Sequence, residues 1–339
     1  MKMDITIKDV AKRAGVSIAT VSRVINKNYV VSREMEGRVL QAIDELNYYP
    51  NSVARSLKNG STLTIGFVIS DISNNYFTTM AKAIEDILQL NHYNVIVCST
   101  HNDEMREHEY LELLRGRKID GLIINTTGKN DDYIERLSKE LPTILVNRKV
   151  KNFNSFKGDF IDSDNNQGCY NITSHLLSYG HRKIGVLNGP QDVSTGIERF
   201  EGFKRAMQQS DILVDKDYIY QYTGDFTMES GYQGAAQLIS LQDRPTALLV
   251  MNNAMVMGAL KYLKLQKISI PDEISIASYG NIENIEVLYV RPSIITLDPW
   301  VIGNKVGDMI IERIRDKDMP NRSIVYVPNL LVGDGVRMV

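Results

Sequence analysis

The stretch AGVSIATVSRVIN, residues 14–26, brings together a glycine turn, small apolar side chains and a guanidinium group. Gly15 suits a tight turn, and the residues after it predict a short helix. A guanidinium can form two hydrogen bonds to a guanine, and small apolar groups can contact a thymine methyl in the major groove. The outer face of this helix therefore has the chemistry needed to contact base edges, with Ser17, Ile18, Ala19, Ser22 and Arg23.

Two kinds of DNA contact are predicted from this region. Base contacts are expected from the first turns of the helix, namely Ser17, Ile18, Ala19 and Arg23. Phosphate contacts, which position a protein without specifying sequence, are expected from Thr6, Lys8, Lys12, Thr20 and Ser22. A glycine turn between two short helices also occurs in proteins that never bind DNA, so these residues alone leave that alternative open.

The first 60 residues predict helices only. One helix begins near 7–11, with Thr6 as a possible N-cap, and the second begins after the turn at 14–16, with Ser17 as its cap. A third helix over 34–46 is predicted from apolar residues at helical spacing, Met35, Val39, Leu40, Ile43 and Leu46. Two short helices around a glycine turn, followed by a supporting helix, form a helix-turn-helix unit.

Beyond residue 60 the pattern changes to short apolar runs separated by helical stretches such as 81–90 and 229–241. Alternation of this kind predicts parallel sheets covered by helices on both faces. More than ten elements over this length suit two doubly wound lobes better than one. The runs that predict strands are 63–69, 94–99, 120–125, 143–147, 183–189, 246–252 and 274–280.

Composition limits the possible function classes. The chain has 339 residues, is 43% hydrophobic and has a formal net charge of −2, but residues 1–60 hold 10 Lys and Arg against 6 Asp and Glu. A basic module on an acidic body indicates a polyanionic partner at one end. Two distant cysteines predict neither a disulfide framework nor a metal site. A polar N-terminus and the lack of a long apolar run predict a cytoplasmic protein without membrane segments.

The segment 6–26, TIKDVAKRAGVSIATVSRVIN, resembles the headpiece of the LacI/GalR family of bacterial transcription regulators. The segment 48–62, YYPNSVARSLKNGST, resembles the hinge helix of the same family. The resemblance implies that two such helices in a homodimer fold together on DNA and insert a leucine into the minor groove. Here the hinge contacts would be Ala54, Arg55 and Leu57.

The rest of the chain is similar to successive blocks of the same family, up to about residue 330. The resemblance implies a body like the periplasmic sugar-binding proteins, with two lobes, three crossovers and a small-molecule cleft. The expected domains are a helix-turn-helix headpiece at 1–50, a hinge at 51–61 and a two-lobed body at 62–339. One lobe would comprise about 62–160 and 291–320, and the other about 161–290 and 321–339.

The same resemblance implies a set of effector-binding residues: Tyr76, Phe77, Arg148, Thr195, Arg199, Phe226 and Asn253. Two positions depart from the family pattern. Asn253 stands where sugar-responsive relatives usually have aspartate, and residues 278–281 read Ser-Tyr-Gly-Asn where Gly-Tyr-Asp-Asn is common. An amide can donate as well as accept hydrogen bonds and does not repel an anion. The departures favour a sugar acid or a phosphorylated metabolite as effector, while a neutral sugar remains an alternative.

These observations predict a DNA-binding transcriptional regulator, expected to be a repressor, that binds a near-palindromic double-stranded operator as a homodimer under effector control. No cofactor, metal or enzymatic activity is expected. The sequence HEYLE at 108–112 lacks the second histidine of a zinc-binding helix, and no phosphate-binding glycine motif occurs. The alternatives are a regulator of carbon metabolism controlled mainly by a partner protein, and a solute-binding protein, which would need an export signal and no basic headpiece.

Overall fold

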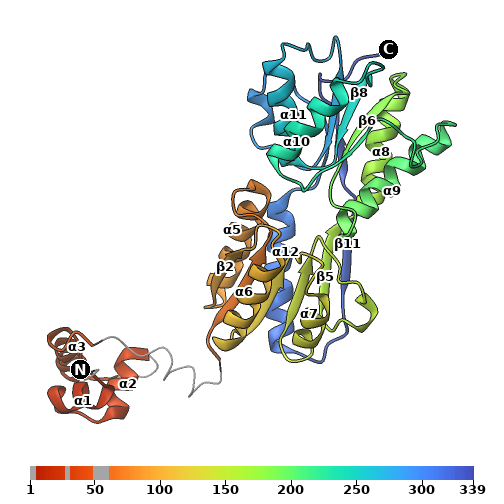
Figure 1. Cartoon of the computed structure of the whole chain (residues 1–339). Coiled ribbons are helices and arrows are strands. Elements are labelled where there is room, and N and C mark those ends of the chain that lie inside the picture. Colours follow the sequence, from red (N-terminus) through yellow and green to blue (C-terminus); the bar gives the residue numbers. More distant parts are fainter. Residues whose placement is uncertain (1–4, 27–30, 49–60) are drawn as a thin grey trace. The chain divides into compact units, whose positions relative to one another are not determined.

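The computed structural model describes residues 5–26, 31–48 and 61–339 (Figure 1). Contacts within the chain divide it into two units, residues 1–62, here called the headpiece, and residues 63–339, here called the body. Within the described residues no helix is both long enough and apolar enough to cross a membrane.

The described part of the headpiece is helical, as predicted. Gly15 ends the first helix with a φ of +66°, a conformation that favours glycine. The carboxylate of Asp9 accepts hydrogen bonds from the N–H and the hydroxyl of Thr6, at 2.8 and 2.6 Å. Ser17 caps the second helix, because its Oγ accepts the N–H of Thr20 at 3.1 Å. The helices are α1 (Ile7–Ala14), α2 (Ile18–Asn26) and α3 (Arg33–Glu45).

The apolar stripe predicted for the third helix is only partly correct. Val39 is fully buried and Ile43 and Leu46 pack against the same core, but Met35 is 41% exposed and Leu40 is 53% exposed. Leu40 lies about 100° around the helix from Val39, off the line that faces α1 and α2. Met35 lies in the first turn of α3. A small three-helix unit buries a narrower face than the sequence pattern suggested.

The body contains two six-stranded sheets, and every strand pair is parallel except β10 with β12. In the first sheet the order is β11 (Ser323–Tyr326), β5 (Asp159–Ser163), β4 (Thr143–Val146), β3 (Gly121–Ile124), β1 (Thr64–Ile69) and β2 (Asn94–Ser99). In the second sheet it is β12 (Asn329–Leu331), β10 (Ser293–Thr296), β9 (Ser275–Tyr279), β8 (Ala247–Val250), β6 (Ile184–Asn188) and β7 (Gln221–Thr223).

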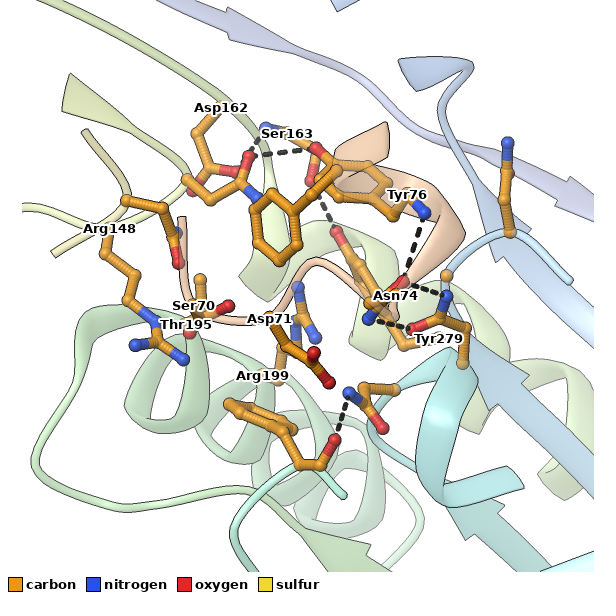
Figure 2. Close-up of a pocket in the computed structure, with 18 of the residues that line it drawn as sticks. Ser70, Asp71, Asn74, Tyr76, Arg148, Asp162, Ser163, Thr195, Arg199 and Tyr279 are labelled. Carbon is orange, nitrogen blue, oxygen red and sulfur yellow. Dashed lines mark hydrogen bonds between the residues drawn. The ribbon is translucent and has the colours of Figure 1, made fainter. Parts of the chain in front are cut away.

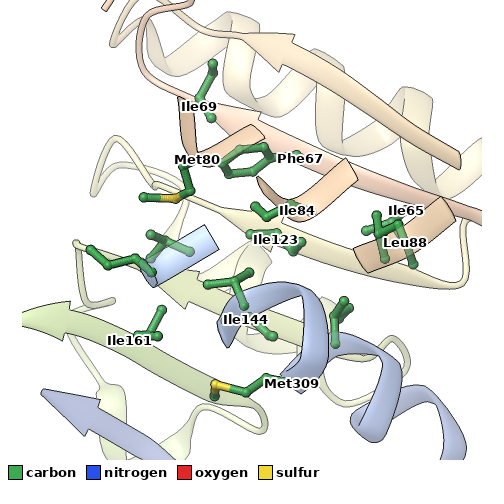
Figure 3. Packing of buried hydrophobic residues seen from close by; sticks show 14 of the residues in the cluster. Ile65, Phe67, Ile69, Met80, Ile84, Leu88, Ile123, Ile144, Ile161 and Met309 are labelled. Atoms are coloured by element: carbon green, nitrogen blue, oxygen red, sulfur yellow. The ribbon is translucent and has the colours of Figure 1, made fainter. Parts of the chain in front are cut away.

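Helices cover both faces of each sheet, so each sheet and its helices form one lobe (Figure 1). In the first lobe, α5 and α12 pack on one face, where Phe67, Met80, Ile84, Ile123 and Met309 form a buried cluster (Figure 3). The first-lobe helices are α5 (Asn75–Leu90), α6 (Glu104–Gly116), α7 (Asp131–Ser138) and α12 (Pro299–Arg315). The second-lobe helices are α8 (Asn165–Ser178), α9 (Ser194–Gln209), α10 (Met228–Ile239) and α11 (Asn253–Leu265). Short 3₁₀ turns lie at Phe153–Ser155 and Ile285–Val287.

All seven predicted strands are present as β1, β2, β3, β4, β6, β8 and β9. The sequence pattern did not predict β5, which contains two aspartates and a serine, or β10, or the short edge strands β7, β11 and β12. Two strands also depart from the expected lobe boundaries. β10 pairs with β9 in the second sheet, and β11 pairs with β5 in the first. Backbone pairing, which chain position does not reveal, decides to which sheet each of these strands belongs.

Candidate DNA interface and ligand cleft

The second helix of the headpiece uses only one face for its own core. Val21 and Val24, three residues apart, are buried against α1 and α3. Ile18, at the first residue of the helix, is 45% exposed, and Ala19 and Arg23 are exposed as well. Ile18 and Ala19 lie in the first turn of α2 and Arg23 lies in its last turn. An exposed isoleucine and an exposed arginine on one short helix form a surface suited to an external partner.

The other predicted DNA contacts differ in how their side chains are used. Lys8 and Lys12 are exposed on α1. The Ser17 hydroxyl lies 2.9 Å from that of Thr20, and the Thr6 hydroxyl donates to Asp9, so these groups also hold helix starts in place. Ser22 is half-buried. The predicted hinge contacts, Ala54, Arg55 and Leu57, lie outside the described residues.

A polar cleft of about 880 Å³, part of it open to solvent, lies between the two lobes of the body (Figure 2). Most of its lining residues lie at or just after the carboxyl ends of parallel strands, where ligands bind in open α/β sheets. All seven residues expected to bind an effector line this cleft: Tyr76, Phe77, Arg148, Thr195, Arg199, Phe226 and Asn253.

Two guanidinium groups dominate the electrostatics of the cleft. Arg148, only 6% exposed, donates from Nη1 to Asn102 Oδ1 at 2.9 Å and to the Thr126 carbonyl at 3.0 Å. Burial and the positive charge of Arg199 lower the pKa of Arg148 to about 10. Arg199 donates from Nε to Asn165 and from Nη1 to the Met251 carbonyl. Among the described residues, neither guanidinium forms an ion pair with a carboxylate.

The buried carboxyl group of Asp162 lies on the same network. Its Oδ1 accepts the N–H of Ser163 and its Oδ2 accepts Asn165 Nδ2, both at 2.7 Å. Asn165 Oδ1 in turn accepts a hydrogen bond from Arg199 Nε. The Asn165 amide therefore links the carboxyl group of Asp162 to the guanidinium group of Arg199. Burial raises the pKa of Asp162 to about 8, although the backbone hydrogen bond and Arg199 act in the opposite direction. The cleft therefore contains an acid that titrates near neutral pH.

Aromatic rings provide the apolar surface of the cleft. The Phe226 ring has both guanidinium groups near it, with Cζ of Arg148 at 5.9 Å and Cζ of Arg199 at 5.7 Å from its centroid. Arg199 also stacks on Tyr279 at 4.0 Å. Phe226 has a φ of +68°, which is rare for a bulky residue, and such strained residues are concentrated at ligand sites. Gly189 makes room for this ring, since a Cβ there would lie 1.9 Å from it.

Several polar groups in the cleft have no partner within the described residues. They are the buried atoms Asn125 Oδ1, Thr195 Oγ1 and Asn281 Oδ1. Unsatisfied buried polar atoms are costly, so these are positions where a bound ligand or a water molecule can supply hydrogen bonds. A hydroxyl group both donates and accepts hydrogen bonds. A ligand with several hydroxyl groups could therefore donate to these oxygens and accept from the two guanidinium groups.

Sequence reasoning missed much of the cleft lining. Further lining residues are Ser70, Asp71, Asn74, Asn102, Asn125, Asn147, Asp162, Ser163, Thr227, Asn252, Tyr279 and Asn281. Many of them come directly after a predicted strand, as Asn147 follows β4 and Asn252 closely follows β8. The rule that parallel strands present ligand-binding residues at their carboxyl ends could have identified these.

Comparison with protein families identifies both units. Residues 6–51 match the model described as bacterial regulatory proteins, lacI family. Residues 62–331 match the model described as periplasmic binding proteins and sugar binding domain of the LacI family. These are models of regulatory and binding proteins rather than of enzymes.

Relatives and solved structures agree with these matches. The chain is 34% identical to the HTH-type transcriptional repressor PurR of Photobacterium profundum, over 98% of each chain. It is similar to the crystal structure of the lac repressor dimer bound to operator and the anti-inducer ONPF, with a TM-score of 0.81, 25% identity, and coverage of 98% and 99%. It is also similar to a LacI family regulator from Enterococcus faecium with bound ribose, with a TM-score of 0.71, 27% identity, and coverage of 81% and 99%.

Proposed function

The chain belongs to the lacI family of bacterial regulatory proteins, and we propose that it is a transcriptional repressor whose operator affinity is set by a small molecule in the body cleft. The observation that supports DNA reading best is the outer face of α2. This helix buries Val21 and Val24. It leaves Ile18 and Ala19 exposed in its first turn, where a recognition helix contacts base edges, and Arg23 exposed in its last turn.

Each group on this surface has a proposed role. Arg23 reads a guanine through two hydrogen bonds, while Ile18 and Ala19 contact thymine methyl groups and Ser17 lies at the same helix start. Phosphate contacts come from Thr6, Lys8, Lys12, Thr20 and Ser22. In the hinge, Leu57 inserts into the minor groove beside Ala54 and Arg55.

We propose that the protein acts as a homodimer on a near-palindromic operator. Two identical headpieces read two half-sites about one helical turn apart, so the symmetry of the operator mirrors that of the dimer. A similar chain, the lac repressor, is bound to its operator as a dimer. Operator binding also places the protein in the cytoplasm.

The proposed effector is a hydroxylated small molecule, a sugar or a sugar acid. A relative with the same body fold holds ribose. The unpartnered Asn125 and Asn281 oxygens accept hydroxyl hydrogen bonds, and Arg148 and Arg199 donate to ligand oxygens. Because the two guanidinium groups have no carboxylate partner in the described residues, they also suit an acidic group, as in a sugar acid or a phosphorylated metabolite.

Effector control follows from linkage between cleft and hinge. A ligand that binds one arrangement of the lobes more tightly shifts the population toward it. Coupling of about 1–3 kcal/mol would change operator affinity by roughly 5- to 150-fold, which is enough to switch a promoter.

The first experiment measures effector binding by thermal shift of the full chain against neutral sugars, sugar acids, sugar phosphates and nucleobases. A ligand at 100 times its Kd should add about 2.7 kcal/mol of stability. Stabilisation by a sugar acid or a sugar phosphate supports an acidic effector. Stabilisation by a neutral sugar contradicts an acidic effector but is still consistent with an effector-controlled repressor.

The second experiment titrates the protein with near-palindromic and scrambled duplexes at one fixed salt concentration, with and without the stabilising ligand. We expect the specific duplex to bind at least ~10³-fold more tightly. Equal affinity for both duplexes would contradict sequence-specific binding. If no compound of the panel stabilises the protein and the protein still binds DNA specifically, the result would instead support control by a partner protein.

A further inference from the structure

Two asparagine side chains connect the lobes directly across the cleft. Asn74 Nδ2 donates to Asn253 Oδ1 at 3.1 Å, and Asn253 Nδ2 donates to Asn74 Oδ1 at 2.9 Å. Asn74 precedes α5 of the first lobe, and Asn253 is the first residue of α11 in the second (Figure 2 labels Asn74). Each amide thus donates one hydrogen bond to the other lobe and accepts one from it.

The Asn74 amide is held in place by its own helix start, and the helix that begins at Asn253 is capped by the neighbouring Asn252. Asn74 Oδ1 also accepts the N–H of Tyr76 at 3.0 Å, which fixes the orientation of this amide. Asn252, which directly precedes Asn253, caps α11 by accepting the N–H of Met255 at its Oδ1. Its Nδ2 also donates a hydrogen bond to the carbonyl of Phe226. The orientation of the Asn74 amide is therefore fixed by backbone, so that pairing requires ordering only of the Asn253 side chain.

The residue types at this contact are specific. A carboxylate at position 253 would have no N–H to donate, and its second oxygen would face the Asn74 oxygen that is already committed to Tyr76. Gly280, the other departure from the family pattern, lies beside the pair: a Cβ there would be 3.5 Å from the Cβ of Asn253. Both departures thus occur at one place, the contact between the lobes.

Uncharged groups also meet elsewhere between the lobes, since the hydroxyls of Ser163 and Tyr279 lie 2.7 Å apart. Two further contacts between the lobes are ion pairs. Lys129 pairs with Asp192 at 2.5 Å, and Lys149 pairs with Glu198 at 2.8 Å. The first of these pairs is about half exposed, and exposed ion pairs contribute little and weaken with salt. The amide pair has no net charge, so neither salt nor pH near neutrality weakens it.

We propose that the Asn74–Asn253 pair is a latch that holds the two lobes in their closed arrangement and so sets the fraction of closed molecules before an effector acts. The inference rests on the proposed function only in treating the cleft as the effector site. It makes Asn253 a contact between the lobes before an effector binds. An effector then regulates the protein in one of two ways. It either adds further contacts between the lobes beside this pair, or it takes the place of one amide in the pair.

The test measures the distance between the lobes in the full chain by pulsed electron paramagnetic resonance. Spin labels are attached to cysteines introduced at Lys82 on α5 and Lys261 on α11, both exposed, while the natural Cys98 and Cys169 are buried. The variants are Asn253→Ala and Asn74→Ser, since serine still caps a helix but is too short to reach the other lobe.

We expect each variant to lower the ratio of closed to open molecules roughly tenfold, because two hydrogen bonds are lost. The double variant should be no more open than either single one, because both residues act through one contact. The matched control is Asn75→Ala, one residue along α5, which should leave the distance unchanged.

Three results would overturn the latch: distances unchanged in both variants, additive opening in the double variant, or opening of the parent protein by concentrated KCl to the extent seen in Asn253→Ala. The last would assign closure to the ion pairs. Operator affinity, measured on the same proteins, separates this inference from the proposed function. A shift in distance without a change in operator affinity retains the latch and contradicts control of DNA binding by the cleft.

Discussion

Arg199 is the residue at which the cleft chemistry converges. Its guanidinium stacks on Tyr279, lies near Phe226 and donates to Asn165, which in turn donates to Asp162. We expect Arg199→Ala to raise the effector concentration for half-maximal response by roughly 10- to 150-fold, the range for losing a charged hydrogen bond. Operator affinity without effector should remain nearly unchanged.

Fluorescence anisotropy of labelled operator across an effector titration measures this response. Arg205→Ala is the matched control, because Arg205 lies on the same helix, is exposed, and contacts Gln167 and Tyr170 instead. A response of Arg199→Ala at the parent's effector concentration would exclude Arg199 from the ligand site.

Arg23 is the residue proposed to give operator specificity. Arg23→Ala should cost about 1–3 kcal/mol on the specific operator and leave binding to unrelated DNA nearly unchanged. Lys8→Ala is the contrasting variant, because a lost phosphate contact weakens both kinds of binding alike. Titrations with specific and unrelated duplexes at one salt concentration distinguish the two. Unchanged specific affinity in Arg23→Ala would remove Arg23 from base reading.

Asp162 predicts a pH dependence of stability. Burial raises its pKa to about 8, against about 3.9 in an unfolded chain. Between these values the folded protein binds a proton that the unfolded chain has lost, so this stabilisation is full below about pH 4 and is lost as pH rises toward about 8. Asp162→Asn should therefore show a flatter decline in free energy of unfolding across the range from about pH 5 to about pH 8.

Urea unfolding at several pH values measures the slope. Asp308→Asn, at an exposed position on α12, is the control and should follow the parent. An identical slope in the parent and in Asp162→Asn would show that this carboxyl group does not titrate with folding in that range.

At the scale of elements, the close packing of α8 and α9 positions two parts of the cleft network, Asn165 and Arg199. Gly202 permits this approach, since a Cβ there would lie 2.1 Å from the Asn166 carbonyl oxygen. Gly202→Ala must push the helices apart, and we expect a loss of about 1–3 kcal/mol in urea unfolding. Gly116→Ala on α6, where a Cβ meets nothing within 4 Å, should cost far less. Equal effects would contradict this packing argument.

At the scale of the whole molecule, a dimer reading two half-sites predicts a strict spacing between them. Inserting about 5 bp at the operator centre turns the half-sites to opposite faces of the duplex. Affinity should then fall to that of a duplex with one half-site, which serves as the reference in the same titration. Affinity unchanged by the insertion would contradict simultaneous reading by two headpieces.

The sequence alone predicted the local elements correctly because their signals are local. The turn at Gly15 and the cap at Ser17 each depend on a few neighbouring residues, and apolar runs identified seven of the strands. The family resemblance placed seven side chains at the cleft. Local signals failed where context decides burial, as at Met35 and Leu40, and where polar residues interrupt a strand, as in β5.

Only the tertiary structure decided how distant residues meet. Asn74 and Asn253 are 179 positions apart, yet each donates a hydrogen bond to the other, and Asp162 acquires a pKa of about 8 only when it is buried beside Asn165. The sheet that β10 or β11 joins is likewise invisible in sequence order. The physical reason is that periodicity and capping report on the next turn of chain. Pairing, burial and electrostatics depend instead on which strand ends the folded sheets bring to one cleft.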